Sequence, residues 1–514
     1  MSRTQKKRLI IAGILIALPV LVLVEEHFRG KWALAKLKRQ LVAKGEKLTI
    51  NDCRPPAPQS AAENGYFELL RAAEMLGGNS LNLAAPRSLN AIAPGKVEVV
   101  YNRAEWKVSD STRATNNNWK TLEDSFSAWR EPLDGVRTAI RRQEFDSGLD
   151  YTLGFDIALP HLARFKSATQ HLGIDALIHL HHGRLDEAID DIEAQLLLSH
   201  HMRNERLLIS QLVRIGITAS AIGPTWQVLQ APGLTDARLE RLQRAWETSE
   251  FTVSLNQSLE MERAMGVAMF TRLRRSVDEA ARNLGVMGMN APGRPVQSVE
   301  DLVDRIGGSS GQLVMKGIYI PLWQFAWSHQ DECSYLETMQ EVLEGSRESA
   351  RRYSVAPSSA VANQLDERSK NQSSYGRVRR HVSEMLAGSM SRAYQRAASI
   401  EAQRALTVTA IALKRYELRH GSTAASLPAL VPEFLREVPR DIFDGQPLRY
   451  RSGGNGNYLL YSIGKDERDD GGDPARPDKV PRNLHITNGR DWVWPMPATE
   501  QEIRAAEEKE RQRK

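Results

Sequence analysis

The sequence predicts a mainly α-helical protein with an N-terminal transmembrane helix, an irregular or solenoid-like all-α body and a small C-terminal α+β domain with an antiparallel sheet. Three observations predict this fold class: an apolar run at 9–24, helical periodicity across 159–284, and strand-like alternation on both sides of a glycine-rich turn at 452–456. The predicted units are a cytoplasmic tail with the anchor (1–28), a juxtamembrane helical region (29–150), an all-helical body (151–390), an α+β head (391–497) and a charged tail (498–514).

The composition is that of a globular protein. Of the 514 residues, 41% are hydrophobic and 26% are charged, close to the averages for soluble domains. These values exclude a wholly disordered chain, a collagen-like chain and a polytopic membrane protein. The formal net charge is only +6, and the basic stretch at 377–380 has no interleaved aromatic residues, so we expect no nucleic-acid partner.

The apolar run at 9–24 predicts a single membrane anchor. Its 16 uncharged residues give a helix of about 24 Å, which snorkelling by Lys7 and Arg8 extends toward the roughly 30 Å of a hydrocarbon core. The run ends at Glu25 and Glu26 without a small-residue cleavage motif, which favours an uncleaved anchor over a cleaved signal peptide or a buried soluble helix. A short basic tail before a large domain favours a cytoplasmic N-terminus, with the body exported across the inner membrane.

The elements after the anchor follow from local sequence. Residues 32–48 predict a basic amphipathic helix, which the prolines of the 53–59 segment end. Residues 63–76 predict a short helix. The apolar segment 311–327 is interrupted by Lys316, Pro321 and Gln324, which favours a packed core segment over a second span. Residues 355–378 are polar and poor in apolar side chains, which predicts a loop.

A helical hairpin is predicted between Thr169 and Met202. Two apolar stretches meet at Gly183, and apolar residues recur at 3–4 spacing from Ala188 to Leu196. The segment resembles a tetratricopeptide hairpin, although the Trp and Tyr positions of that family are absent and no 34-residue repeat follows. Because one hairpin cannot bury its own face, we expect the neighbouring helices to complete the core.

Seven of the twelve histidines lie between His161 and His201. Three of them, His171, His179 and His182, share one predicted helix face with Asp175. Imidazoles in this arrangement are candidate transition-metal ligands, although an H-E-x-x-H motif is absent. The other interpretation is a polar face between packed helices.

The C-terminal region predicts a helix over 392–420, stopped at Gly421, followed by a β-hairpin. From Arg392 to Trp494 the sequence resembles the globular head of the major pseudopilin of type II secretion. The matching residues are Tyr416, Gly421, Leu427, Leu430, Pro439, Asp441, Phe443, Gly445, Pro447, Tyr450, Tyr461, Ser462, Gly464 and Asp466. No prepilin motif accompanies them, so we do not expect a filament subunit. The whole chain also resembles uncharacterised bacterial membrane-anchored proteins with a tetratricopeptide-like body.

The pseudopilin resemblance implies a calcium site in the loop after the second strand. The candidate ligands are Asp466, Asp469, Asp470, Asp473 and Asp491. Carboxylate oxygens are the ligands that Ca²⁺ prefers, and the glycines of this loop allow tight wrapping. The spacing is not that of an EF-hand, and a solvated acidic loop is the alternative.

No residue pattern identifies a catalytic centre. The G-x-S-x-G match at 307–311 follows a predicted helix and has linker composition, unlike a nucleophile elbow. Cys53 and Cys333 are too few for a disulfide scaffold, and unpaired thiols are favoured over a single bridge. The sequence therefore predicts a non-enzymatic interaction or assembly role for a membrane-anchored envelope protein, with a protein partner in a secretion or pilus-like machine. The alternative is a metal-dependent envelope hydrolase that uses the histidine face.

Overall fold

The computed structural model describes residues 3–56, 63–77, 85–106, 117–288, 314–388, 390–454, 457–475, 487 and 489–512. Within its helices and strands, the side chains of residues 3–4, 6–16, 284–288, 454 and 510 are not described.

The chain is mainly helical. Its α-helices are α1 Arg3–Ala43, α2 Ile50–Cys53, α3 Tyr66–Met75, α4 Trp119–Phe126, α5 Arg130–Ala139, α6 Pro160–His181, α7 Leu185–His201, α8 Leu208–Leu229, α9 Asp236–Glu247, α10 Thr252–Arg275, α11 Val277–Gly288, α14 Ile320–Leu322, α15 Ser328–Arg352, α16 Ala356–Lys370, α17 Ser374–Arg379, α18 His381–Ala387, α19 Ala393–His420 and α20 Glu500–Gln512. Two π-helical turns flank α14, η5 Met315–Tyr319 and η6 Trp323–Trp327. Short 3₁₀ turns are η2 Ser127–Trp129, η3 Tyr151–Asp156, η4 Met202–Asn204 and η7 Leu427–Leu430.

The described residues also form three small sheets. They contain β1 Asn90–Ala93, β2 Lys96–Glu98, β3 Glu105–Trp106, β4 Asn117–Asn118, β5 Arg449–Gly454, β6 Asn457–Ser462, β7 Trp492–Val493 and β8 Met496–Pro497. The strand orders are β1-β2-β8, β3-β4 and β5-β6-β7, and all pairs are antiparallel except β2 with β8.

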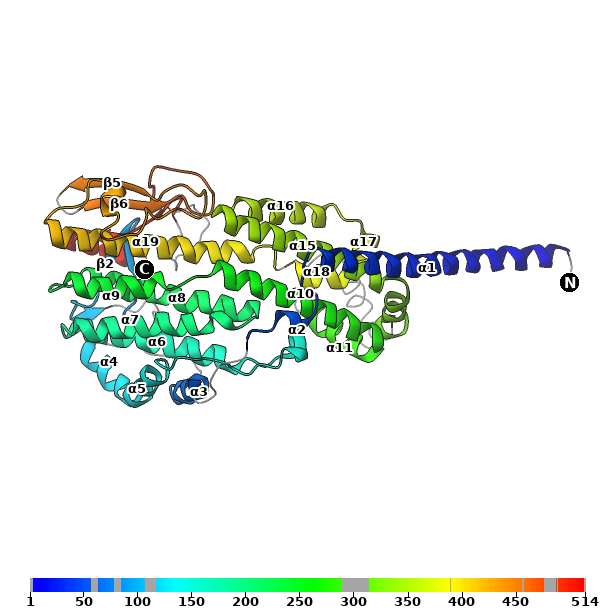
Figure 1. Cartoon of the computed structure of the whole chain (residues 1–514), viewed down its shortest axis with the longest axis horizontal. Coiled ribbons are helices and arrows are strands. Elements are labelled where there is room, and N and C mark those ends of the chain that lie inside the picture. Colours follow the sequence, from blue (N-terminus) through cyan, green and yellow to red (C-terminus); the bar gives the residue numbers. More distant parts are fainter. Residues whose placement is uncertain are drawn as a thin grey trace.

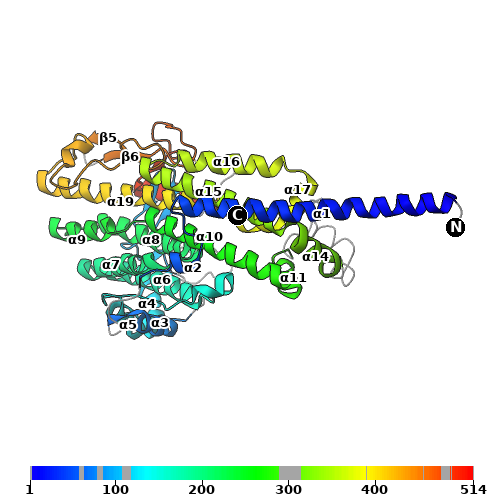
Figure 2. The same cartoon turned by 45° about the vertical axis from the view of Figure 1, so that its right-hand side comes forward.

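The molecule is an elongated body with one projecting helix. Figures 1 and 2 show the first part of α1 extending alone from one end, while the β5–β6 hairpin lies at the other end. One hydrophobic core cluster includes side chains of α1, of the central helices and of the C-terminal sheet, from Leu34 to Trp494. The predicted domain boundaries stay predictions.

The predicted helical hairpin is confirmed. α6 and α7 meet at Gly183, whose φ of +71° lies in the left-handed region that glycine adopts readily. Ala188 is fully buried where the helices approach. α8 packs on both helices, so a neighbouring helix covers the hairpin as expected.

The predicted C-terminal elements are also confirmed. α19 ends at Gly421, which has a φ of +69°. The hairpin β5–β6 follows, with Tyr450 paired to Leu460. β6 lies against α19, and α19 in turn packs on α8 and α9, so this helix joins the sheet to the helical body.

The loop prediction for 355–378 is wrong, because α16 and α17 occupy most of this segment. α16 packs closely on α15 at Gly345, where an added Cβ would come within 2.9 Å of Val361 Cγ2. Such close approach buries small residues, Ser358 and Ala362, so the helix needs few large apolar side chains. The strands β1 to β4 were not predicted either, since two to four residues are too few to show alternation.

The predicted anchor lies within α1, which continues through Pro19 as one helix. A search of the described residues finds no helix that is long and apolar enough to cross a membrane. The side chains of 9–16, half of the predicted span, lie outside the described set. The transmembrane helix stays a prediction.

The contact of α10 with α15 gives a stability prediction. Gly266 faces Tyr335, and an added Cβ would overlap the buried tyrosine ring. We expect Gly266→Ala to lower the free energy of unfolding by about 1–3 kcal/mol through overpacking. The measurement is denaturant unfolding of the full chain.

The matched control is Gly216→Ala on the exposed side of α8, where an added Cβ meets nothing within 4 Å. Helix propensity predicts that this change raises stability by about 1 kcal/mol. Equal effects of the two substitutions would contradict the close contact at Gly266.

Candidate functional site

Three candidate metal ligands converge on the α6–α7 hairpin. They are Asp175 and His179 of α6 and Asp191 of α7, and their ligand atoms lie within 4.8 Å of one another. Within the described ranges, no other set of three or more His, Cys, Asp or Glu residues is grouped in this way. His179 Nε2 is 3.5 Å from Asp175 Oδ2 and 3.6 Å from Asp191 Oδ2.

An arginine already occupies the space between the two carboxylates. Arg137 of α5 donates from Nη2 to Asp175 Oδ2 at 2.5 Å and to Asp191 Oδ1 at 2.6 Å. Its Nε also donates to Asp191 Oδ1 at 2.8 Å, and its Nη1 donates to Asp134 Oδ1 at 2.7 Å. The guanidinium supplies the positive charge that a metal ion would supply, and it ties α5 to both helices of the hairpin.

Burial and charge act in opposite directions on the two carboxylates. Asp191 is completely buried, and this desolvation raises its pKa well above the ordinary value despite Arg137. Burial also acts to raise the pKa of Asp175, but His179 and Arg137 outweigh it and the pKa is lowered. Both aspartates raise the pKa of Arg137 against its own desolvation. The group is therefore an ion-pair network, and a metal ion binds there only if Arg137 leaves.

The three predicted histidine ligands do not come together. His171 is buried, with its Nδ1 2.8 Å from the Ser167 carbonyl oxygen and its ring 5.0 Å from that of Trp129; burial lowers its pKa. His182 lies at the surface, where its Nε2 is 2.7 Å from Glu123 Oε1.

Sequence reasoning missed two members of the network. The sequence could have indicated Asp191, because this carboxylate stands between the apolar positions Ile189 and Ile192 of the second hairpin helix. No sequence feature indicates Arg137, because its role arises only when α5 packs beside the hairpin.

The predicted calcium ligands organise their own loop. Asp491 is fully buried, and its carboxylate accepts backbone N–H groups from Gly472 at 2.7 Å, Asp473 at 3.1 Å and Asp470 at 3.4 Å. These bonds tie Asp491 to residues 470–473 of the loop.

The carboxylates of Asp466, Asp469 and Asp473 have local partners as well. Asp469 accepts the Tyr461 hydroxyl at 3.0 Å and lies 3.4 Å from Arg449 Nε. Asp466 accepts the Arg468 N–H at 3.3 Å, and Asp473 pairs with Arg490 at 3.3 Å. Residues 476–486 of this loop lie outside the described set, and the calcium site stays a prediction.

Asp441 is hydrogen-bonded to two other residues of the pseudopilin resemblance, Phe443 and Ser462. Its buried carboxylate accepts the Ser462 hydroxyl at 2.9 Å, the Ile463 N–H at 2.8 Å and the Phe443 N–H at 3.1 Å. Burial raises the pKa of this carboxyl. The bonds fasten the segment after α19 to the end of β6.

Cys53 and Cys333 are free thiols. Burial raises the pKa of Cys53 to about 11 and that of Cys333 to about 12, so both stay protonated at neutral pH. The G-x-S-x-G segment at 307–311 lies outside the described residues.

Comparison with protein-family models, curated proteins and solved structures finds no match in any of the three. The resemblances to tetratricopeptide hairpins and to pseudopilin heads stay predictions.

The ion-pair network predicts a pH-dependent stability change. In Arg137→Met, Asp191 loses the cation that offsets its burial, so we expect stability to fall wherever Asp191 is ionised in the unaltered chain, by up to about 3–5 kcal/mol. The folded-state pKa of Asp191 lies above its ordinary 3.8, so folding favours the protonated form. The loss is therefore small below that ordinary value and grows as pH rises through the folded-state pKa. Unfolding of the full chain across pH measures it.

Arg241→Met is the control on the outer side of the same hairpin. Arg241 pairs with Asp190 and Glu193, each at 2.8 Å, but all three side chains are partly exposed. Water screens such pairs, so we expect a loss below about 1 kcal/mol with little pH dependence. If the Arg137 variant behaves in the same way, Asp191 does not depend on this arginine.

Proposed function

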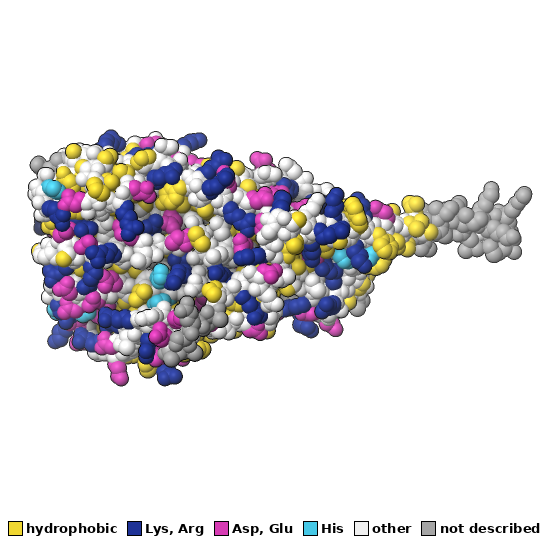
Figure 3. Space-filling view, in the orientation of Figure 1, with side chains coloured by type: hydrophobic (Ala, Val, Ile, Leu, Met, Phe, Trp, Pro, Cys, Tyr) yellow, Lys and Arg dark blue, Asp and Glu magenta, His cyan; other side chains and the backbone are white. Residues whose placement is uncertain are grey.

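We propose that this chain is a single-pass inner-membrane protein with its body on the exported side, where the body has a non-enzymatic interaction or assembly role. The supporting observation is the contrast between the two parts of α1. Leu18 and Leu21 are 63% and 65% exposed on the projecting part, whereas Leu34 and Leu41 are buried against the body. Figure 3 shows hydrophobic side chains gathered where the helix leaves the body. Such exposure on one free helix fits burial in lipid.

Ion pairs hold the second part of α1 against the body. Lys38 Nζ is 2.5 Å from Glu332 of α15, a fully buried carboxylate that also pairs with Arg274 at 2.5 Å. Glu26 pairs with Arg379 at 3.0 Å. An anchor fixed in this way determines how the body is held at the membrane.

Ion pairs also hold the segment just after α1 against the body. Glu46 pairs with Arg347 at 2.6 Å and with Arg263 at 2.8 Å, and it accepts Gln340 at 2.9 Å. Burial acts against its ionisation, but these three partners lower its pKa to about 2. The pair network fastens the chain to α10 and α15 together.

The proposed partner is a protein of a secretion or pilus-like machine. This part of the proposal rests on the resemblance of residues 392–494 to the pseudopilin head. The Asp441 hydrogen bonds support it, because they join Asp441 to Phe443 and Ser462, two further residues of the resemblance.

A metal-dependent hydrolase is the second candidate, favoured by the convergence of Asp175, His179 and Asp191. Arg137 in their midst argues against it. Elemental analysis of the purified full chain discriminates between the two: one zinc per chain that is lost in His179→Ala would favour the hydrolase.

Membrane fractionation tests the anchor. We expect the full chain to stay with the membrane through an alkaline carbonate wash, and Leu18→Arg combined with Leu21→Arg to be released. An arginine near the centre of a span costs about 2.5–3.5 kcal/mol on insertion scales.

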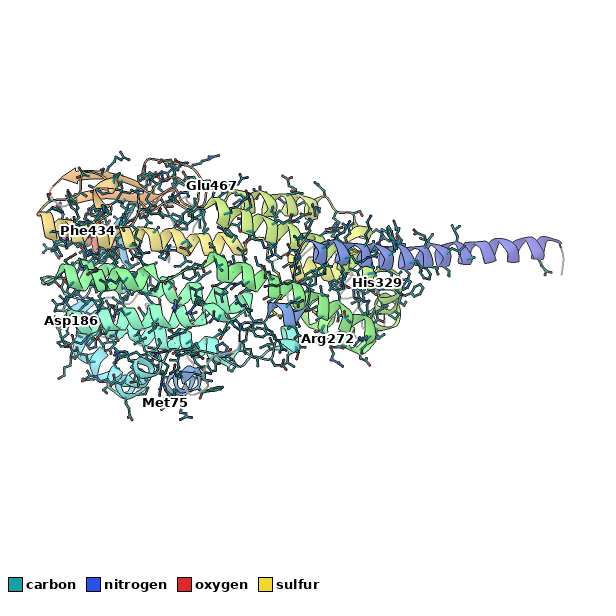
Figure 4. All side chains as sticks on the ribbon, in the orientation of Figure 1. Met75, Asp186, Arg272, His329, Phe434 and Glu467 are labelled. Atoms are coloured by element: carbon teal, nitrogen blue, oxygen red, sulfur yellow. The ribbon has the colours of Figure 1, made fainter. Side chains whose placement is uncertain are left out.

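The control combines Phe67→Arg and Met75→Arg on α3, two similarly exposed apolar residues. Figure 4 shows Met75 on the edge of the body away from the projecting helix. This variant should stay with the membrane. Release of the unaltered chain by carbonate would contradict the anchor.

A further inference from the structure

Exposed apolar side chains cluster at the end of the body from which α1 projects. Five large residues lie between 48% and 65% exposed: Phe28 and Trp32 of α1, Ile318 of η5, Phe325 of η6 and Tyr375 of α17. We refer to these five as the collar. In Figure 1, α17 lies beside α1 near the point where the helix leaves the body.

Specific contacts place the collar around one turn of α1. The ring of His27 stacks on Phe325 at 5.0 Å, and its Nδ1 is 2.6 Å from the Phe325 carbonyl oxygen. On the neighbouring helix, Arg379 pairs with Glu26 and lies 5.1 Å from the centre of the Tyr375 ring. Phe325 and Tyr375 therefore lie at the level of residues 26–28.

Two further contacts place η5 and His329 at the same junction. The Tyr319 hydroxyl donates to the Val378 carbonyl oxygen at 2.9 Å, which holds η5, and Ile318 with it, against α17. His329 stands beside this junction (Figure 4), with its ring 5.4 Å from that of His27. At the helical rise, the turn 26–28 begins roughly 3–6 Å beyond Val24, the end of the apolar run.

The part of α1 near the collar carries more positively than negatively charged side chains. Lys31, Lys36 and Arg39 are exposed, and within the described part of the chain none of them forms an ion pair. Lys36 Nζ lies 5.3 Å from the centre of the Trp32 ring. The nearby acidic residues Glu25 and Glu26 are paired with arginines, so they do not neutralise these cations.

We infer that the collar rests in the headgroup region of an anionic lipid bilayer, with Phe28, Phe325 and Tyr375 in the interface and with Lys31 and Lys36 facing lipid phosphates. Aromatic rings favour the membrane–water interface. Lysine and arginine near a negatively charged surface add electrostatic attraction. The inference rests on the proposed membrane anchor, because the end of the apolar run sets the collar at this depth.

The test uses the full chain reconstituted into vesicles. Phe325→Cys and Ile318→Cys variants are labelled with an environment-sensitive fluorophore, and Phe67→Cys on α3 is the matched control. The lipids carry a headgroup quencher in phosphatidylcholine, with or without an equal part of phosphatidylglycerol. The unaltered chain gives the labelling background, which the buried Cys53 and the half-buried Cys333 keep low because both thiols are protonated.

We expect strong quenching at 318 and 325 in the anionic vesicles, weaker quenching in neutral vesicles, and little quenching at 67 in either. Lys31→Gln combined with Lys36→Gln should lower the ratio of docked to undocked chains by roughly fivefold per charge. Lys120→Gln, an exposed lysine on α4, should leave the ratio unchanged.

The outcomes separate this inference from the proposed function. If the chain stays with the vesicles but labels 318 and 325 are quenched no more than label 67, the collar inference is wrong and the anchor stands. Shielding of these labels from water without quenching by lipid would indicate a second copy or another protein on the collar, which also overturns the inference. A chain that does not join the vesicles contradicts the anchor itself.

Discussion

Burial of carboxylates against arginines and lysines from other helices determines how this molecule holds together. Glu332 is completely buried between Lys38 and Arg274. A buried carboxylate without its cation is strongly destabilising, so each such group specifies which helices must be neighbours. Glu332 thereby joins α1, α10 and α15, as Asp191 joins α5 to the α6–α7 hairpin through Arg137.

Charge pairing also explains why Asp175, His179 and Asp191 come together without leaving an open metal site. The two aspartate carboxylates would repel each other if both were ionised and no cation lay between them. Arg137 supplies that cation from a third helix, with bonds of 2.5–2.8 Å to both aspartates. A guanidinium offers several donors in one plane, which suits two carboxylates on adjacent helices. The geometry therefore favours a structural role for this part of the hairpin.

The parts of the fold that follow from local rules were predictable from the sequence. Gly183 and Gly421 end helices because their backbone is left-handed, and the β5–β6 hairpin follows from alternation around a glycine-rich turn. α16 was missed because it packs through small residues against Gly345 rather than through a large apolar stripe. Of the candidate site, His179 and Asp175 were predictable from helical spacing. Arg137 was not, because its partners are 38 and 54 residues away along the chain.

A docked α1 also has a consequence for the far end of the molecule. The ion pairs of Glu26, Lys38 and Glu46 fasten the second half of α1 and the segment after it to the body, so the helix and the body form one unit. The C-terminal sheet lies at the opposite end from the projecting helix (Figure 1). If α1 is held in a membrane, the β5–β6 hairpin lies at the end of the body away from the bilayer, as do Asp186 and Phe434 (Figure 4). A partner in the envelope would then meet the β5–β6 hairpin before the parts of the body that lie near the bilayer.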